Sequence, residues 1–183
     1  FGFIDDRVTL SSGWKFFGQI VAAVILMYWG GVNIGHLFIA NDFYLPAWLS
    51  LPITLLVIVA VTNAFNLSDG LDGLAGGAAL MSLSGLVLLA TSVSVTSVAV
   101  LCVIVIGSIL GFLRFNTYPA QVFMGDAGSQ ILGFSIAVFS IILTQDLDVP
   151  YSPALPLFLV GVPIVDMLTV MFERIRLGQS PFI

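Results

Sequence analysis

No charged side chain occurs in the 41 residues between Asp72 and Arg114. A membrane-spanning helix needs about 20 mostly apolar residues at about 1.5 Å rise per residue, so this run is too long for one crossing. Polar residues at 91–97 interrupt it near the middle, which predicts two spans joined by a turn. Lipid gives backbone amides no partner, and long apolar runs without alternation indicate helices and not a barrel. The sequence therefore predicts an all-α, polytopic membrane helical bundle.

The rest of the chain has the composition of such a bundle. Of its 183 residues, 59% are hydrophobic and 8% are charged, whereas about 25% charged is usual in soluble domains. Uncharged runs predict six transmembrane helices in one integral-membrane domain over 1–183, with spans near 16–32, 46–65, 73–91, 97–113, 127–145 and 153–172. Pro163 predicts a kink in the last span. Residues 1–4 read as the end of an earlier apolar helix and no starting Met is present, so we expect a truncated domain.

The charges test this threading. Six spans put both ends on one side of the membrane, and all five basic residues fall in the loops of that side: Arg7, Lys15, Arg114, Arg174 and Arg176. Because basic residues concentrate in cytoplasmic loops, these loops and both ends are predicted to be cytoplasmic, with His36 on the opposite side. Five scattered basic residues form no patch, which excludes a nucleic-acid partner.

Three of the same loops bring five aspartates to one membrane face: Asp5, Asp6, Asp69, Asp72 and Asp126. Clustered carboxylates near a membrane need a compensating cation. Carboxylate and carbonyl oxygens select magnesium, manganese or calcium, and magnesium leaves positions for water and substrate phosphates. This is the outline of a phosphoryl-transfer site.

The backbone near these acids fits an anion site. Asp69 and Asp72 are three apart, so a helix starting near Asp69 would place them on one face, with Asp69 as its N-cap. Four glycines at 70–77 leave bare amides at that helix start, which favours phosphate. Asp126 lies between two glycines at the start of another apolar run, which repeats the arrangement.

Other interpretations remain open from the residues alone. Each acid by itself is equally well explained as a helix cap. A cation transporter predicts carboxylates at mid-membrane depth, but only Asp166 is predicted to lie within a span, where it either pairs with a neighbouring helix or faces a cavity. An inactive membrane scaffold is a third interpretation.

Spaced motifs along nearly the whole chain resemble the polyprenyl-phosphate N-acetylhexosamine-1-phosphate transferases. They are GFIDD at 2–6 with Lys15 and Gln19, NAFNLSDGLDGLAGG at 63–77, FLRFNTYPAQVFMGDAGS at 112–129, GVPIVD at 161–166 and RIRLGQSPF at 174–182. The NAFN and SPF segments are more similar to the branch that loads N-acetylglucosamine-1-phosphate onto undecaprenyl phosphate. The phospho-N-acetylmuramoyl-pentapeptide transferases are the alternative branch.

The resemblance implies a reaction and its setting. Undecaprenyl phosphate attacks the phosphorus of a UDP-N-acetylhexosamine, giving lipid-diphospho-sugar and UMP, with magnesium, or manganese in its place, as cofactor. This would be the first membrane step of a cell-envelope polysaccharide, at the cytoplasmic face of a bacterial inner membrane, with a second copy of the chain as a partner in a homodimer. A phosphate nucleophile needs little base catalysis because its second pKa is near 6.

The resemblance also implies roles for individual residues. Asp126 would be catalytic and hold the metal, while Asp5 and Asp6 would be catalytic at the lipid phosphate. The implied substrate-binding residues are Lys15 and Asn116 near phosphates, Asn63, Asn66, Asp69 and Asp72 in a nucleotide-sugar loop, and Phe123 against the uracil. The family's histidine-rich loop lies just beyond the position of Phe182, so little or no activity is expected of residues 1–183 alone.

Overall fold

The computed structural model describes residues 2, 11–37, 44–145, 152 and 154–179. Within these ranges the regular structure is helical, apart from an isolated β-bridge between His36 and Tyr44. The helices are α2 (Ser12–Gly30), α3 (Ala47–Ser68), α4 (Leu74–Ser92), α5 (Thr96–Asn116), α6 (Gly125–Thr144), α7 (Leu155–Leu159) and α8 (Gly161–Arg176).

Four of these helices, α3 to α6, are long and apolar enough to cross a membrane. They agree to within one turn with the spans predicted at 46–65, 73–91, 97–113 and 127–145. The predicted break at 91–97 is the turn between α4 and α5, where Ser94 has a φ of 61°. The protein is therefore a multi-pass membrane helical bundle.

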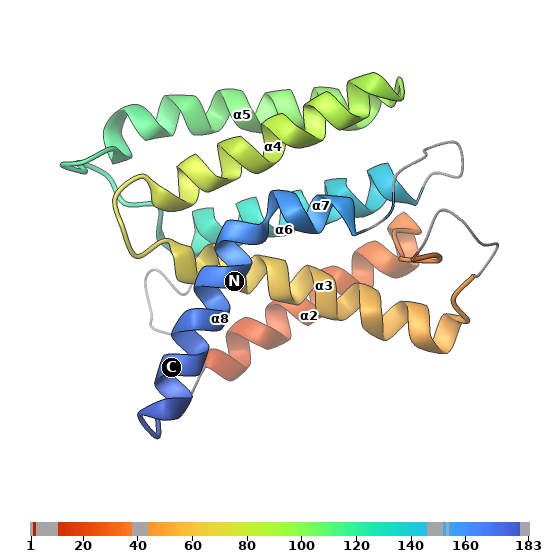
Figure 1. Ribbon diagram of the computed structural model, residues 1–183, viewed down its shortest axis with the longest axis horizontal. Coiled ribbons are helices and arrows are strands. Elements are labelled where there is room, and N and C mark those ends of the chain that lie inside the picture. The colour runs from red at the N-terminus through yellow and green to blue at the C-terminus, as the bar shows by residue number, and fades with distance from the viewer. Residues whose placement is uncertain (1, 3–10, 38–43, 146–151, 153, 180–183) are drawn as a thin grey trace.

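The other two predicted spans are built differently. Helix α2 covers most of 16–32 but is not among those four. The span predicted at 153–172 is divided at Val160 into α7 and α8, and α8 runs across the other helices in Figure 1. At this break Ser82 donates to the Leu159 carbonyl at 2.7 Å, which satisfies a backbone group in an apolar setting. Six spans with both ends cytoplasmic stay a prediction.

The disturbance predicted at Pro163 is present as a break in the span: Pro163 has no N–H to donate to the carbonyl four residues earlier, that of Leu159, and the helix is interrupted at Val160. Pro163 occupies the third position of α8. The missing N–H of a proline costs nothing in the first helical turn, where amides have no partner in the helix, so Pro163 is compatible with a helix start.

Helix α3 lies at the centre of the bundle and packs against α2, α6 and α8, while α4 pairs mainly with α5. Helices α3 and α6 approach closely at Gly133, where an added Cβ would lie 2.7 Å from the Thr62 Cα. Small residues let membrane helices pack this closely. Fully buried side chains such as Phe65, Leu86 and Ile136 fill the interior.

One end of the bundle collects the ends of five helices: α2, α4 and α6 begin there, and α3 and α5 end there. We call it the Asp126 end. The cations of the described residues also lie at helix ends on this side, and they are Lys15, Arg114, Arg174 and Arg176. His36 lies at the opposite end, where its backbone N–H donates to Gln145 just after α6, as the threading predicts.

Candidate active site

Asp126 occupies the first turn of α6, which begins at Gly125. Gly125 has a φ of 67°, a conformation that suits glycine and lets the chain turn sharply into the helix. The amides at a helix start have no partner in the helix, and the helix dipole is positive there, so the carboxylate is favoured at this position. The predicted helix start at Asp126 is confirmed.

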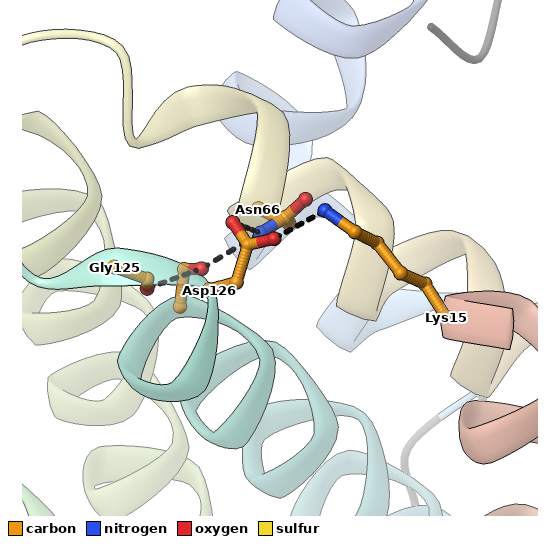
Figure 2. Close-up of polar contacts among 5 residues, drawn as sticks. Lys15, Asn66, Gly125 and Asp126 are labelled. Atoms are coloured by element: carbon orange, nitrogen blue, oxygen red, sulfur yellow. Dashed lines mark hydrogen bonds and ion pairs between the residues drawn. The ribbon is translucent and has the colours of Figure 1, made fainter. Parts of the chain in front are cut away.

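Helices α2 and α3 each place a polar side chain on this carboxylate (Figure 2). Lys15 from α2 approaches with its Nζ 2.5 Å from Oδ2, and Asn66 from α3 donates through Nδ2 to Oδ1 at 2.9 Å. The Lys15 and Asp126 side chains are each 30% exposed, so the pair is accessible at the protein surface. The sequence predicted these three residues as site residues, and the structure brings them into contact.

Ser129 completes the contact between α3 and α6. The Asn66 amide also donates to the Ser129 hydroxyl at 3.0 Å, and this hydroxyl donates to the Gly125 carbonyl at 3.0 Å. Ser129 is fully buried. Ser129 is not among the predicted site residues, although its place three residues after Asp126 puts it on the same helix face.

The Asp69–Gly73 segment differs from the prediction. No helix starts near Asp69: α3 continues through Ser68, Asp69 is its C-cap, and α4 begins at Leu74 after Gly73 at a φ of 75°. Asn63 and Asn66 consequently lie on a helix and not in a loop. An asparagine is tolerated there because its amide can bond within the helix, as Asn63 does to the Val59 carbonyl at 2.8 Å.

Asn116 and Asp72 tie this turn to the segment that precedes α6. Asn116 is 3% exposed, accepts from the Gly73 N–H at 3.1 Å and donates to the Val122 carbonyl at 2.9 Å. The Asp72 carboxylate accepts from the Ala120 N–H at 3.0 Å. Both side chains therefore brace two loops against each other. Their predicted substrate contacts stay predictions.

Phe123 follows this brace and is 75% exposed at the Asp126 end. An exposed aromatic ring at the edge of the site is compatible with the predicted uracil contact.

Asp5 and Asp6 lie outside the described residues, but described residues flank them. An added Cβ at Gly2 would lie 2.5 Å from the Ala127 Cα, so the Gly2 backbone lies directly against the first turn of α6. Lys15, on the other side in sequence, contacts Asp126. Gly2 and Lys15, described residues on either side of the paired aspartates in sequence, thus both lie beside the start of α6.

Asp166 lies on α8 and accepts a hydrogen bond from Ser68 at 3.3 Å. Ser68 is the last residue of α3 and is buried. Of the two roles left open for Asp166, this contact favours pairing with a neighbouring helix.

The donor set at Asp126 fits a hard cation. The Asn66 side-chain oxygen accepts no hydrogen bond from a described residue, so it and the Asp126 carboxylate offer oxygen ligands from two helices. Magnesium commonly uses one or two protein carboxylates and completes its shell with water and substrate phosphates. No group of three His, Cys, Asp or Glu that could hold a metal occurs among the described residues. Two oxygen ligands alone would leave most positions of such a cation to water and phosphate.

Residues 1–144 match Glycosyl transferase family 4. The chain belongs to this family. Among the relatives of this family-4 chain is the "Probable undecaprenyl-phosphate N-acetylglucosaminyl 1-phosphate transferase" of Bacillus subtilis, 38% identical over 98% of this chain and 50% of the relative. The undecaprenyl-phosphate alpha-N-acetylglucosaminyl 1-phosphate transferase of Escherichia coli K12 is 32% identical over 99% of this chain and 51% of the relative.

The alternative branch is also represented. The phospho-N-acetylmuramoyl-pentapeptide-transferase of Halalkalibacterium halodurans is 35% identical over 95% of this chain and 55% of the relative. The family-4 chain thus spans about half the length of the curated relatives it matches. The predicted family resemblance is confirmed.

Proposed function

We propose that the protein transfers an N-acetylhexosamine-1-phosphate, with N-acetylglucosamine as the sugar, from its UDP derivative to undecaprenyl phosphate and releases UMP. The observation that carries this proposal is the contact of Lys15, Asn66 and Asp126 at the ends of three helices in a family-4 chain. Both named N-acetylglucosaminyl relatives align with nearly the whole chain, which supports the same reaction class.

The described residues supply positioning and charge for this reaction. The Lys15 ammonium group is placed to hold a phosphate oxygen beside Asp126, because the pair is partly exposed. Asn66 and Ser129 fix the carboxylate on the first turn of α6. A charged nucleophile and a charged diphosphate repel each other, so a cation between them lowers the barrier.

We propose magnesium, with manganese as a substitute, as the cofactor. Asp126 and the Asn66 side-chain oxygen would hold it, and Asp5 and Asp6 would serve the lipid phosphate from the segment between Gly2 and Lys15. When bound, the metal neutralises the diphosphate charge and aligns the two phosphates. Asp69, Asp72 and Asn116 would shape the nucleotide-sugar site.

The proposed placement is six spans in one catalytic domain of a bacterial inner membrane, with both ends and the site at the cytoplasmic face. The cations at the Asp126 end support it, because cytoplasmic loops are enriched in Lys and Arg. A homodimer stays a prediction.

Phospho-N-acetylmuramoyl-pentapeptide transfer is the second candidate, because a relative with that name is 35% identical to this chain. The test uses membranes that contain the complete gene product. These membranes are supplied with undecaprenyl phosphate, magnesium and radiolabelled UDP-N-acetylglucosamine. Label in the lipid fraction with release of UMP is expected. Parallel reactions with UDP-N-acetylgalactosamine and UDP-N-acetylmuramoyl-pentapeptide identify the donor. If no donor labels the lipid, the proposed function is refuted.

A further inference from the structure

Gln19 lies on α2, one helical turn from Lys15, and is 6% exposed. Its side-chain oxygen accepts a hydrogen bond from the Asn63 amide of α3 at 2.7 Å. Its own amide nitrogen makes no hydrogen bond to a described residue. Gln19 is one of the residues that line a cavity of about 390 Å³ between α2 and α6. Burying an amide with one partner is costly, so this single bond is the compensation that the structure provides.

The Gln19–Asn63 hydrogen bond is placed to fix the position of the Lys15 side chain. Residues four apart lie on one face of a helix, so Lys15 and Gln19 both face the groove between α3 and α6. On α3, Asn63 is likewise one turn before Asn66, which holds Asp126. Two polar links therefore run side by side: Gln19 to Asn63, and Lys15 through Asp126 to Asn66.

Apolar packing alone fixes the position of α2 weakly. Lipid tails are as apolar as the helix surface, so interhelical hydrogen bonds and close packing determine how membrane helices dock. Of the described polar contacts of α2 with α3, the Gln19–Asn63 bond is the one nearest to Lys15. Without it, α2 can rotate or slide and carry the Lys15 ammonium group away from the carboxylate.

We propose that Gln19 is a positioning residue: its hydrogen bond to Asn63 fixes α2 against α3 and thereby holds Lys15 on Asp126. The link to catalysis rests on the proposed function, but the geometry does not. The Asn63 amide uses both of its hydrogens within the bundle, on Gln19 and on Val59. The predicted contact of Asn63 with the nucleotide sugar stays a prediction.

The test uses the complete gene product in membranes and measures acetylation of Lys15 by peptide mass spectrometry. Lys15 is the only lysine in this sequence, so its peptide reports one amine. Gln19→Met removes the bond at similar volume, and we expect acetylation about three- to tenfold faster, the range that one interhelical hydrogen bond in a membrane supports. Met27→Val is the control, because Met27 is buried on the same face of α2 two turns further away.

A second pair of variants separates this role from general loosening. Gln19→Asn shortens the link and is expected to speed acetylation, whereas Gln19→Asn with Asn63→Gln restores its length and should return the wild-type rate. Equal rates in wild type, Gln19→Met and Gln19→Asn would overturn the proposal, as would an equal increase in Met27→Val. If Gln19→Met does not fold, the comparison of Gln19→Asn with the double variant Gln19→Asn and Asn63→Gln tests the proposal instead.

Sugar-phosphate transfer is measured on the same membranes. Gln19→Met is expected to lower kcat in proportion to Lys15 exposure and to leave the KM for the UDP-sugar near wild type. In a Lys15→Met background it should have no further effect on kcat, and an additive loss contradicts a role through Lys15. If wild-type membranes transfer no sugar phosphate, the proposed function fails, while Lys15 acetylation still decides the role of Gln19.

Discussion

Helix α6 lies against the backbone of α3 at Gly133, so Gly133→Ala tests whether this close approach sets the geometry of the site. The new Cβ would lie 2.7 Å from the Thr62 Cα and 3.0 Å from the Val61 carbonyl oxygen. Both are backbone atoms and cannot rotate away. Ordinary contact begins at 3.4 Å, so the two helices must separate locally by about 0.7 Å, which is more than close-packed interiors absorb without cost.

The separation reaches the site through the bonds of Asn66. Asn66 lies one turn beyond Thr62 and donates to Asp126 at 2.9 Å and to Ser129 at 3.0 Å. Transmitted in full, the shift lengthens both bonds to about 3.6 Å or more, beyond hydrogen-bond range. Overpacking costs about 1–3 kcal/mol of stability, and a catalytic group misplaced by about 1 Å lowers the rate about 100-fold.

The assay is the initial rate of UMP release by membranes with saturating lipid phosphate and UDP-sugar, normalised to folded protein. Gly111→Ala on α5 is the matched control, because a Cβ at Gly111 meets no atom within 4 Å. Both substitutions gain up to about 1 kcal/mol of helix propensity. The difference between the two variants therefore reports the contact with α3.

We expect Gly133→Ala to lose between tenfold and about 100-fold in kcat, and Gly111→Ala to keep the wild-type rate. A Gly133→Ala protein with wild-type kcat and thermal stability would refute the reasoning, since the α3–α6 approach would then not control Asn66. Equal losses in both variants would show instead that a glycine in any of these helices is needed.

Three further substitutions test the site directly. Asp126→Asn is expected to lower UMP release by about 100-fold or more, as loss of a preorganised charge does; near-normal turnover with magnesium would remove Asp126 as the metal ligand. Asp72→Asn, which weakens the acceptor for the Ala120 N–H, should weaken UDP-sugar binding in calorimetry by about tenfold, and unchanged affinity contradicts its role in the loop brace. Gly2→Ala places a Cβ 2.5 Å from the Ala127 Cα and should reduce sugar-phosphate transfer. Gly13→Ala is the control and should not reduce it, because the nearest atom to its Cβ lies at 4.0 Å. Equal activity of the two variants contradicts the predicted place of the paired aspartates.

The spans α3 to α6 could be predicted because the length of an uncharged run decides whether it crosses a membrane. Where a helix ends inside a polar motif could not be predicted in the same way. Asn63 through Ser68 remain helical because their side chains find partners on α2, α6 and α8. Those partners are far away in sequence, so local preference gave the wrong helix start at Asp69.

For the site, the threading predicted a common membrane face but no pairs. Lys15 and Asp126 were both expected there, and their direct contact depends on how α2 packs against the centre of the bundle. Asn116 shows a role that the motif does not reveal. Its side chain is 3% exposed and both of its polar atoms bond to backbone, so it braces two loops against each other. The substrate contact that the motif implies stays a prediction.

The ion pair between Lys15 and Asp126 joins residues 111 positions apart, with three helices between them. A ribosome makes the chain from its N-terminus, so Lys15 reaches the membrane before Asp126 has been made. On the proposed cytoplasmic placement of the Asp126 end, its ammonium group would in that interval hold the start of α2 on the side of the membrane where cations are retained. The same group later receives the carboxylate when α6 inserts. Substitutions of Lys15 should therefore alter the insertion of α2 during synthesis as well as the chemistry of the finished protein.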